Sequence, residues 1–175
     1  MRLRSIMPLS AALLASAGCA TTAATNHELA RASIADASGR AIGSALISDR
    51  AGIVTLTVQV TGLKPGPHGI HLHAVGQCVA PTFASAGGHL NPGMHQHGVQ
   101  NPAGSHLGDL PNIAVAADGA GAATIMLPGQ WAELSPHIFD TDGTAVVIHA
   151  GPDDYRSDPA GNSGGRIACG VLSPA

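Results

Sequence analysis

The chain has 175 residues, of which 11% are Asp, Glu, Lys or Arg and 2% are aromatic, and its formal net charge is −3 at pH 7. This length fits one ordinary domain, and the composition excludes a basic nucleic-acid binder, a highly charged disordered chain and a coiled coil. The ten histidines outnumber the eight Lys and Arg residues together, an excess that points to metal or proton chemistry.

The first predicted element is a leader. Arg2 and Arg4 precede an apolar stretch, 6–17, that is too short to span a bilayer as a mature helix. Residues 16–19 read SAGC and resemble a bacterial lipoprotein signal, which would make Cys19 the lipidated N-terminus. Secretory cleavage near residue 17 or 23 is the alternative. We expect a lipoprotein-type signal peptide over 1–18 and a flexible tether over 19–27. Without the leader, six basic residues face eleven acidic ones, a formal charge of −5.

The rest of the chain, 28–175, predicts one all-β domain. The clearest strand is 53–60, where β-branched residues alternate with others. The pair Asp118-Gly119 is a hairpin signal. We predict eight strands, at 29–35, 41–47, 53–60, 69–74, 113–117, 122–127, 145–149 and 166–172. No amphipathic helix of useful length is expected, so the fold class is an antiparallel β-sandwich or barrel.

Three long segments interrupt this pattern and predict functional loops. Residues 75–111 contain no strand-like run, although they are rich in Gly, Pro and Asn and carry several histidines. Loops longer than about 12–15 residues are uncommon in compact domains unless they serve a function. Residues 128–144 and 150–165 are two further long loops.

Two cysteines remain once Cys19 is assigned to the leader. Cys78 and Cys169 form an even pair, 91 positions apart, and export to an oxidising compartment favours a disulfide between them. The alternative is a pair of thiolate metal ligands, although no CxxC spacing supports it.

The histidines fall into a pattern typical of metal ligands. His71 and His73 lie two apart on a predicted strand, so their side chains share one face. The long loop follows with His89, His97, His106 and Asp109, and the strand 145–149 ends in His149. Six histidines and one aspartate exceed a single tetrahedral site. Imidazoles suit copper and zinc, and the carboxylate favours zinc in one of the sites.

Two segments are similar to the signatures of a known family. Residues 69–78 (GIHLHAVGQC) and 161–170 (GNSGGRIACG) resemble the two signature sequences of copper–zinc superoxide dismutases. Residues 88–92 and 106–110 lie between them in the expected order, and the resemblance covers about 28–173. It is closest to the exported bacterial branch, in which the interval between the first cysteine and the bridging histidine is long.

The resemblance implies an eight-stranded Greek-key β-barrel that holds one copper and one zinc per subunit. The implied copper ligands are His71, His73, His89 and His149. The implied zinc ligands are His89, His97, His106 and Asp109, so that His89 is shared. It also implies a Cys78–Cys169 disulfide, catalytic roles for Arg166, which guides the anion, and for His89, and an outer carboxylate, Asp153, that links a copper ligand to a zinc ligand.

Four histidines stand outside this assignment. His95 is an alternative to His97, which is preferred because glycine follows it, as in the family. His68 matches a structural histidine of the family, whereas His27 and His137 match no motif and are expected to be surface or tether residues.

The implied activity is the disproportionation of superoxide to dioxygen and hydrogen peroxide through alternate reduction and reoxidation of copper. A non-catalytic copper-binding or delivery domain on the same fold is the first alternative, and a zinc hydrolase is disfavoured because no glutamate lies in a metal motif. We expect a periplasmic protein, anchored to the outer membrane only through Cys19, with no nucleic-acid partner. The sequence leaves open whether it is a monomer or a homodimer.

Overall fold

A computed structural model describes residues 25–175. It contains ten strands and one α-helix, in the order β1 Asn26–Asp36, β2 Ala41–Arg50, β3 Ile53–Val60, β4 Gly66–His68, β5 Ile70–His73, β6 Ile113–Val115, β7 Gly121–Met126, α1 Trp131–Ile138, β8 Ala145–His149, β9 Arg166–Val171 and β10 Ser173–Pro174. A short 3₁₀ turn, Ala84–Ala86, lies in the long loop after β5.

The central strands form because apolar residues alternate with polar ones. In β3, Val54, Leu56, Val58 and Val60 are buried, whereas their neighbours are exposed or half-buried. Two continuous antiparallel ladders join β3 to β2 and to β7. One face of this sheet therefore supplies the main core, and the other faces solvent.

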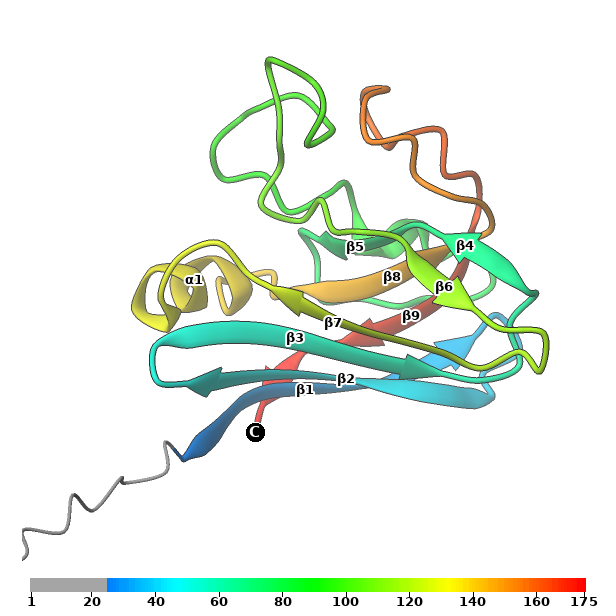
Figure 1. The fold of residues 1–175 in the computed structure, drawn as a ribbon, viewed down its shortest axis with the longest axis horizontal. Helices are drawn as coiled ribbons and strands as arrows, with labels where there is room; N and C mark the ends of the chain where they lie inside the picture. Colours follow the sequence, from blue (N-terminus) through cyan, green and yellow to red (C-terminus); the bar gives the residue numbers. More distant parts are fainter. Residues whose placement is uncertain (1–24) are drawn as a thin grey trace, which may run out of the picture.

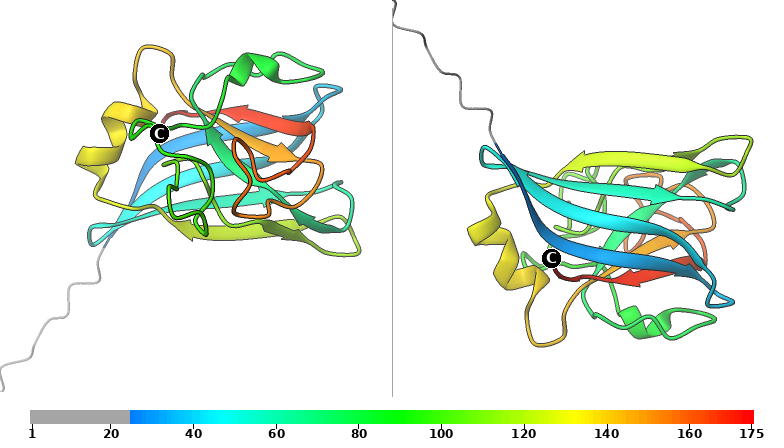
Figure 2. Two further views of the ribbon diagram at one scale, coloured as in Figure 1. Left: turned by 90° about the horizontal axis from the view of Figure 1, so that it is seen from above. Right: turned by 90° about the horizontal axis from the view of Figure 1, so that it is seen from below.

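The ten strands form an antiparallel, nearly closed barrel, as predicted (Figures 1 and 2). The strand order is β4-β6-β7-β3-β2-β1-β9-β8-β5, with β10 on β1. The two ends of this order, β4 and β5, are consecutive in the chain and are separated only by Gly69. The Gly69 N–H donates to the Gly151 carbonyl, and its own carbonyl accepts from His149.

The barrel carries its long loops on one side. In Figure 1, residues of the green 75–111 segment and the orange 150–165 segment rise above β5 and β8. Both β5 and β8 are buried along their whole length because the loops cover their outer face. A histidine on either strand is therefore held inside the protein.

Three features differ from the sequence-based predictions. The segment 128–144 contains helix α1, in which Leu134 and Ile138 are buried one turn apart. The strand count is ten because β4 and β10 are two- to three-residue ladders. β1 starts at Asn26, so the last two residues of the predicted tether belong to the barrel. Within the described residues, no helix is long and apolar enough to cross a membrane.

Candidate metal centres

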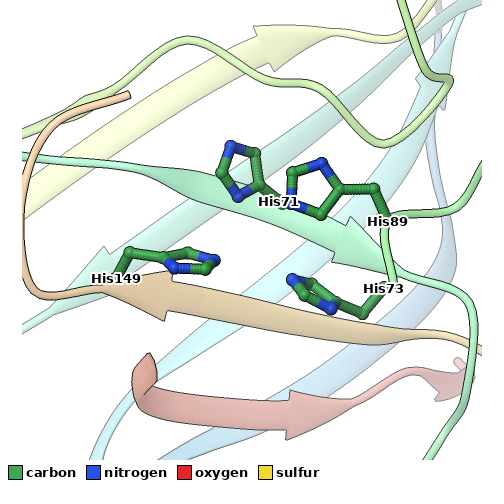
Figure 3. A group of neighbouring side chains, drawn as sticks. All are labelled: His71, His73, His89 and His149. Atoms are coloured by element: carbon green, nitrogen blue, oxygen red, sulfur yellow. The ribbon is translucent and has the colours of Figure 1, made fainter. Parts of the chain in front are cut away.

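Four histidines from three parts of the chain converge on one point (Figure 3). His71 and His73 project from β5, His149 ends β8, and His89 reaches them from the 75–111 loop through an isolated bridge to His73. One nitrogen of each ring lies within 4.8 Å of the corresponding nitrogens of the others. All four residues are at most 9% exposed, so this first cluster is closed to bulk water on most sides.

The hydrogen bonds of the first cluster leave one nitrogen of each ring without a partner. Each of three rings donates its outer N–H to a neighbouring oxygen. His71 donates to Asp153 (2.8 Å), His73 to the Gly87 carbonyl (3.0 Å) and His149 to the Gly164 carbonyl (3.1 Å). The remaining nitrogens are buried and make no hydrogen bond within the described residues: His71 Nδ1, His73 Nε2, His89 Nε2 and His149 Nε2. Buried polar atoms are rarely left in this state. Four such lone pairs aimed at one point fit a metal ion of the kind that imidazole binds, such as copper or zinc.

A second cluster is built around the carboxylate of Asp109. Its Oδ1 lies 2.9 Å from His89 Nδ1, 2.9 Å from His97 Nδ1 and 3.0 Å from His106 Nδ1. Its Oδ2 accepts the backbone N–H groups of Gly98 and His106, which fixes the orientation of the carboxylate. Four bonds of about 2.0 Å in a tetrahedron place ligand atoms roughly 3.3 Å apart. The spacing of these four atoms therefore fits a zinc ion within a modest adjustment.

His89 belongs to both clusters. Its Nδ1 lies beside Asp109 and 3.4 Å from His106 Nδ1, whereas its Nε2 is the unpartnered nitrogen of the first cluster. The ring centre is 4.0 Å from that of His71 and 5.1 Å from that of His97. One imidazole can therefore bridge two metal ions through its two nitrogens.

Asp153 makes a second connection between the clusters. Its Oδ2 lies 2.8 Å from His71 Nε2, and its Oδ1 lies 3.0 Å from His97 Nε2. Asn112 holds the main chain of Asp153 on both sides: the amide of Asn112 donates to the Asp153 carbonyl and accepts from its N–H. A side chain at Gly161 would collide with the carboxylate of Asp153 and lie 2.8 Å from His97 Nε2. The packing here thus fixes the carboxylate between two imidazoles.

Burial keeps the imidazoles of the first cluster neutral. Desolvation lowers the pKa of His71 and of His149 to about 4, although hydrogen bonds to Asp153 and Gly164 oppose the shift. Desolvation likewise lowers the pKa of His73 to about 2 and depresses that of His89. Metal binding requires deprotonated ligands, so the histidines need no proton release near neutral pH.

The two carboxylates are held ionised. Burial alone would raise the pKa of Asp109, but hydrogen bonds from His89 and from the N–H groups of Gly98 and His106 outweigh it, and the pKa falls below its usual range. Burial would also raise the pKa of Asp153, but hydrogen bonds from His71 and His97 lower it to about 2. The site therefore offers two fixed negative charges to cations.

Arg166 lies at the open side of the first cluster. A cavity of about 400 Å³ is lined by Arg166 together with His73, His89, His106 and His149. Arg166 pairs in register with His149, and its guanidinium donates to the carbonyls of Phe83 and Gly87, both at 2.6 Å. Partial burial lowers the pKa of Arg166, but an arginine remains charged at neutral pH. A positive group thus borders the entrance through which a small anion would approach.

The structure also settles the cysteine pairing. Cys78 and Cys169 form a disulfide, as predicted, which ties the start of the long loop to β9. This excludes the alternative in which both thiolates bind metal. Cys19 and the leader lie outside the described residues.

The histidines outside the two ligand sets occupy other positions. His97, and not His95, lies in the second cluster, and His95 is exposed. His68 is buried, and its two ring nitrogens lie 2.7 Å from the carbonyls of His149 and Lys64, which is a structural position. His27 lies on β1, with its ring 3.0 Å from the hydroxyl of Thr25. His137 is on the exposed side of α1.

Several groups that hold the site residues in place were not predicted from the sequence. Asn112 could have been noticed as the polar residue just before a predicted strand, but nothing local links it to Asp153. Asp158 accepts the His97 N–H at 2.6 Å, and the carbonyl of Gly87 accepts from both His73 and Arg166. Backbone carbonyls have no sequence signature, so these contacts become visible only in three dimensions.

Comparison with known proteins gives a consistent result. The family model described as copper/zinc superoxide dismutase matches residues 22–172. A protein of Aquifex aeolicus named superoxide dismutase [Cu-Zn] 2 is 42% identical over 148 residues, which cover 82% of this chain and 85% of that protein. A superoxide dismutase [Cu-Zn] of Caulobacter vibrioides is 41% identical over 138 residues, covering 77% of this chain and 79% of the relative.

Solved structures with the same fold include both an enzyme and a dismutase-like protein. Crystal structures of a SOD-like protein from Bacillus subtilis match this chain with TM-scores of 0.73 for a double mutant and 0.75 for another structure of the protein. The latter is 40% identical in sequence, and the match covers 82% of this chain and 97% of the Bacillus chain. The Cu/Zn superoxide dismutase from Brucella abortus is 30% identical, with a TM-score of 0.66, covering 82% and 98%.

Proposed function

The chain belongs to the copper/zinc superoxide dismutase family, and from this premise we propose which of its residues carry the reaction. It is an oxidoreductase whose substrate is superoxide and whose cofactors are copper and zinc. The observation that carries the residue assignment is the set of four unpartnered nitrogens beside a second, carboxylate-centred cluster.

The first cluster is the copper site, with His71, His73, His89 and His149 as ligands. An all-imidazole set supports both oxidation states that the redox cycle needs. The second cluster is the zinc site, with His89, His97, His106 and Asp109 as ligands, since zinc favours a tetrahedral set of nitrogen and oxygen donors. Bound copper supplies the one-electron redox chemistry, and bound zinc supplies a fixed positive charge.

The protein's own residues attract the anion and handle the proton. Arg166 attracts superoxide into the cavity and orients it, because its charge is held in place by two carbonyl groups. His89 holds a proton at Nε2 between the two half-reactions while its Nδ1 stays beside Asp109. Asp153 is a positioning residue that keeps His71 and His97 in the required orientation.

The local positive charge matters because the remainder of the protein is acidic. A mature chain with a net charge of −5 repels an anion at long range, but this repulsion is screened beyond about 8–10 Å at ordinary salt. Inside the cavity, Arg166 is the lining residue with a permanent positive charge. The short-range field therefore decides the final approach.

The N-terminal segment supports an exported form. We assign residues 1–18 to a signal peptide, the residues from Cys19 to the start of β1 to a tether, and the remainder to one dismutase domain. Lipidation of Cys19 would anchor the protein to the outer membrane on its periplasmic side, and the oxidised Cys78–Cys169 pair suits that compartment. Mass spectrometry of the mature N-terminus tests this; an unmodified N-terminus at residue 18 or 24 contradicts the lipid anchor.

The residue assignment is tested by measuring copper, zinc and superoxide consumption on the same purified sample. We expect one copper and one zinc per chain and rapid consumption that a copper chelator abolishes. His149→Ala should lose copper and activity while it retains zinc, whereas His27→Ala should retain all three. Copper binding at full stoichiometry without superoxide consumption would instead support a copper-delivery domain.

A further inference from the structure

Two histidines remain without a role after both metal sites are assigned. His95 lies in the 75–111 loop and His137 on α1, 42 positions later in the chain. Both are exposed, and both line the same cavity of about 350 Å³, which lies between the loop and the helix. Figure 2 shows the yellow helix beside the green loop at this end of the barrel. The fold thus brings together two exposed imidazoles that the sequence separates.

A carboxylate completes the donor set. Glu133 lines the same cavity and precedes His137 by four residues, which places both on one face of α1. One carboxylate oxygen of Glu133 accepts the Gln130 N–H at 3.0 Å, which holds the side chain at the start of the helix. The second oxygen of the carboxylate adds acceptor capacity that the cap does not use.

The loop side of this cavity is also ordered. The His95 N–H donates to Asn91 Oδ1 at 3.0 Å, and its carbonyl accepts from Asn91 Nδ2 at 2.8 Å. The His95 ring folds back over Gly93, where a Cβ would lie 2.7 Å from its Nε2. The carbonyl of His95 also lies 3.1 Å from Nε2 of His106, which lines the cavity and belongs to the second cluster. The cavity therefore adjoins the zinc site without sharing the three donors His95, Glu133 and His137.

We propose that His95, Glu133 and His137 form an accessory, exchangeable site for a divalent transition-metal cation such as zinc. Two imidazoles and one carboxylate are donors that zinc accepts, and three protein ligands leave one position for water. Within the described residues, the three donor atoms do not converge within 4.8 Å as those of the two main clusters do. Glu133 stays bound to the helix cap and uses its second oxygen, so binding requires rotation of the two exposed imidazoles, which is fast but costs conformational entropy. The accessory site is therefore weaker than the zinc site and releases its ion readily.

The test uses the holoenzyme, with its copper and zinc first quantified at one each per chain. Equilibrium dialysis against Zn²⁺ should reveal one further zinc per chain. His95→Ala and His137→Ala should each weaken this additional binding by at least about tenfold. Glu133→Gln keeps an acceptor for the helix cap but removes the charge, and should also weaken binding. His27→Ala, which removes an exposed histidine on β1, is the matched control and should leave the binding unchanged.

Two results would overturn the proposal. The first is a holoenzyme that takes up no zinc beyond its first equivalent. The second is additional zinc binding that survives in the His95→Ala, His137→Ala double variant. Circular dichroism and the copper and zinc content of each variant separate a loss of this site from a loss of fold. Because the two resident metals are measured beforehand, a negative result leaves the assignment of the main sites intact.

Discussion

At the scale of single residues, the two clusters differ in one carboxylate, Asp109, which belongs only to the second cluster. Asp109 accepts five close contacts, three from imidazole nitrogens and two from backbone N–H groups, and no other residue in the second cluster carries a negative charge. The first cluster contains no carboxylate. A change at Asp109 should therefore act on one metal.

We predict that Asp109→Ala lowers the zinc content at least about tenfold while the copper content stays near one per chain. The loss leaves the N–H groups of Gly98 and His106 without their acceptor, so the loop around them should also become more mobile. Elemental analysis of the purified variant, with Asp118→Ala on the β6–β7 turn as control, measures the effect. Normal zinc in Asp109→Ala would contradict the ligand assignment.

Substitution of Arg166 should lower the rate of superoxide consumption and leave the copper and zinc content unchanged. Arg166→Ala removes the positive charge of the cavity but none of the unpartnered nitrogens, so we expect superoxide consumption to fall about tenfold or more with full copper and zinc. The dependence of the rate on ionic strength should weaken as well. Arg31→Ala, which removes an equal charge from β1, is the control. An unchanged rate in Arg166→Ala at full copper occupancy would exclude the proposed steering.

The residue roles that sequence could predict are those with fixed spacing. His71 and His73 share a face because they lie two apart on a strand, and the disulfide follows from an even pair of cysteines. Asn112 and the carbonyl of Gly87 could not be predicted in this way. Their roles depend on the 150–165 loop and on Arg166, which lie 41 and 79 positions away.

At the scale of elements, the sequence predicts strands better than short ladders and helices. β3 matches its predicted range, 53–60, because its alternation is strong. Helix α1 was missed because it is only eight residues long and contains Pro136, which removes a helical N–H donor. A signal was present nevertheless: Gln130 and Glu133 form a capping box, and Leu134 and Ile138 follow at helical spacing.

The disulfide-linked segment after β5 is the element that positions Arg166. Phe83 and Gly87, whose carbonyls accept from the guanidinium, lie between Cys78 and the bridging His89. Phe83 and Ala86 pack with Ala145, Val147 and Cys169 in a small core of their own. The segment is therefore held at its start by the disulfide and along its length by apolar contacts.

We predict that replacing both cysteines by serine lowers the free energy of unfolding by about 2–5 kcal/mol, because the bridge closes a loop of 91 positions. Activity should fall further than copper content, since the carbonyls that hold Arg166 become mobile. Denaturant unfolding with both metals saturating gives the first quantity. Wild-type protein treated with a thiol reductant should show the same loss; an unaltered midpoint would show that apolar packing alone holds the segment.

At the scale of the whole molecule, the buried neutral histidines make stability depend on pH. In the unfolded chain a histidine takes up a proton near pH 6.5, whereas in the folded protein the pKa of His71 and of His149 is about 4. Between these values the unfolded state binds more protons, so stability is complete above pH 6.5 and is lost as the pH falls. The slope is roughly 1.4 kcal/mol per pH unit for each such histidine.

We therefore predict that the metal-free protein loses stability between pH 6.5 and 4, which urea denaturation at a series of pH values can follow. Asp153 titrates below this window, so its loss adds only under stronger acid. His149→Gln should reduce the slope, whereas His137→Gln, at an exposed position, should preserve it. A free energy of unfolding that stays level across this interval would contradict the neutral state assigned to the cluster.

The strand order of the barrel also determines when, during synthesis, the copper site can be completed. β5 carries His71 and His73, but its ladder partner β8 ends at His149, and the strand that covers β8 starts only at Arg166. During synthesis, a chain that has emerged as far as residue 144 contains His71, His73 and His89, three of the four copper-site histidines, but lacks His149 and the partner strand of β5. The fourth copper ligand and the strand that pairs with β8 are thus the last parts of the site to be made, so the copper site is complete only when nearly the whole chain is available.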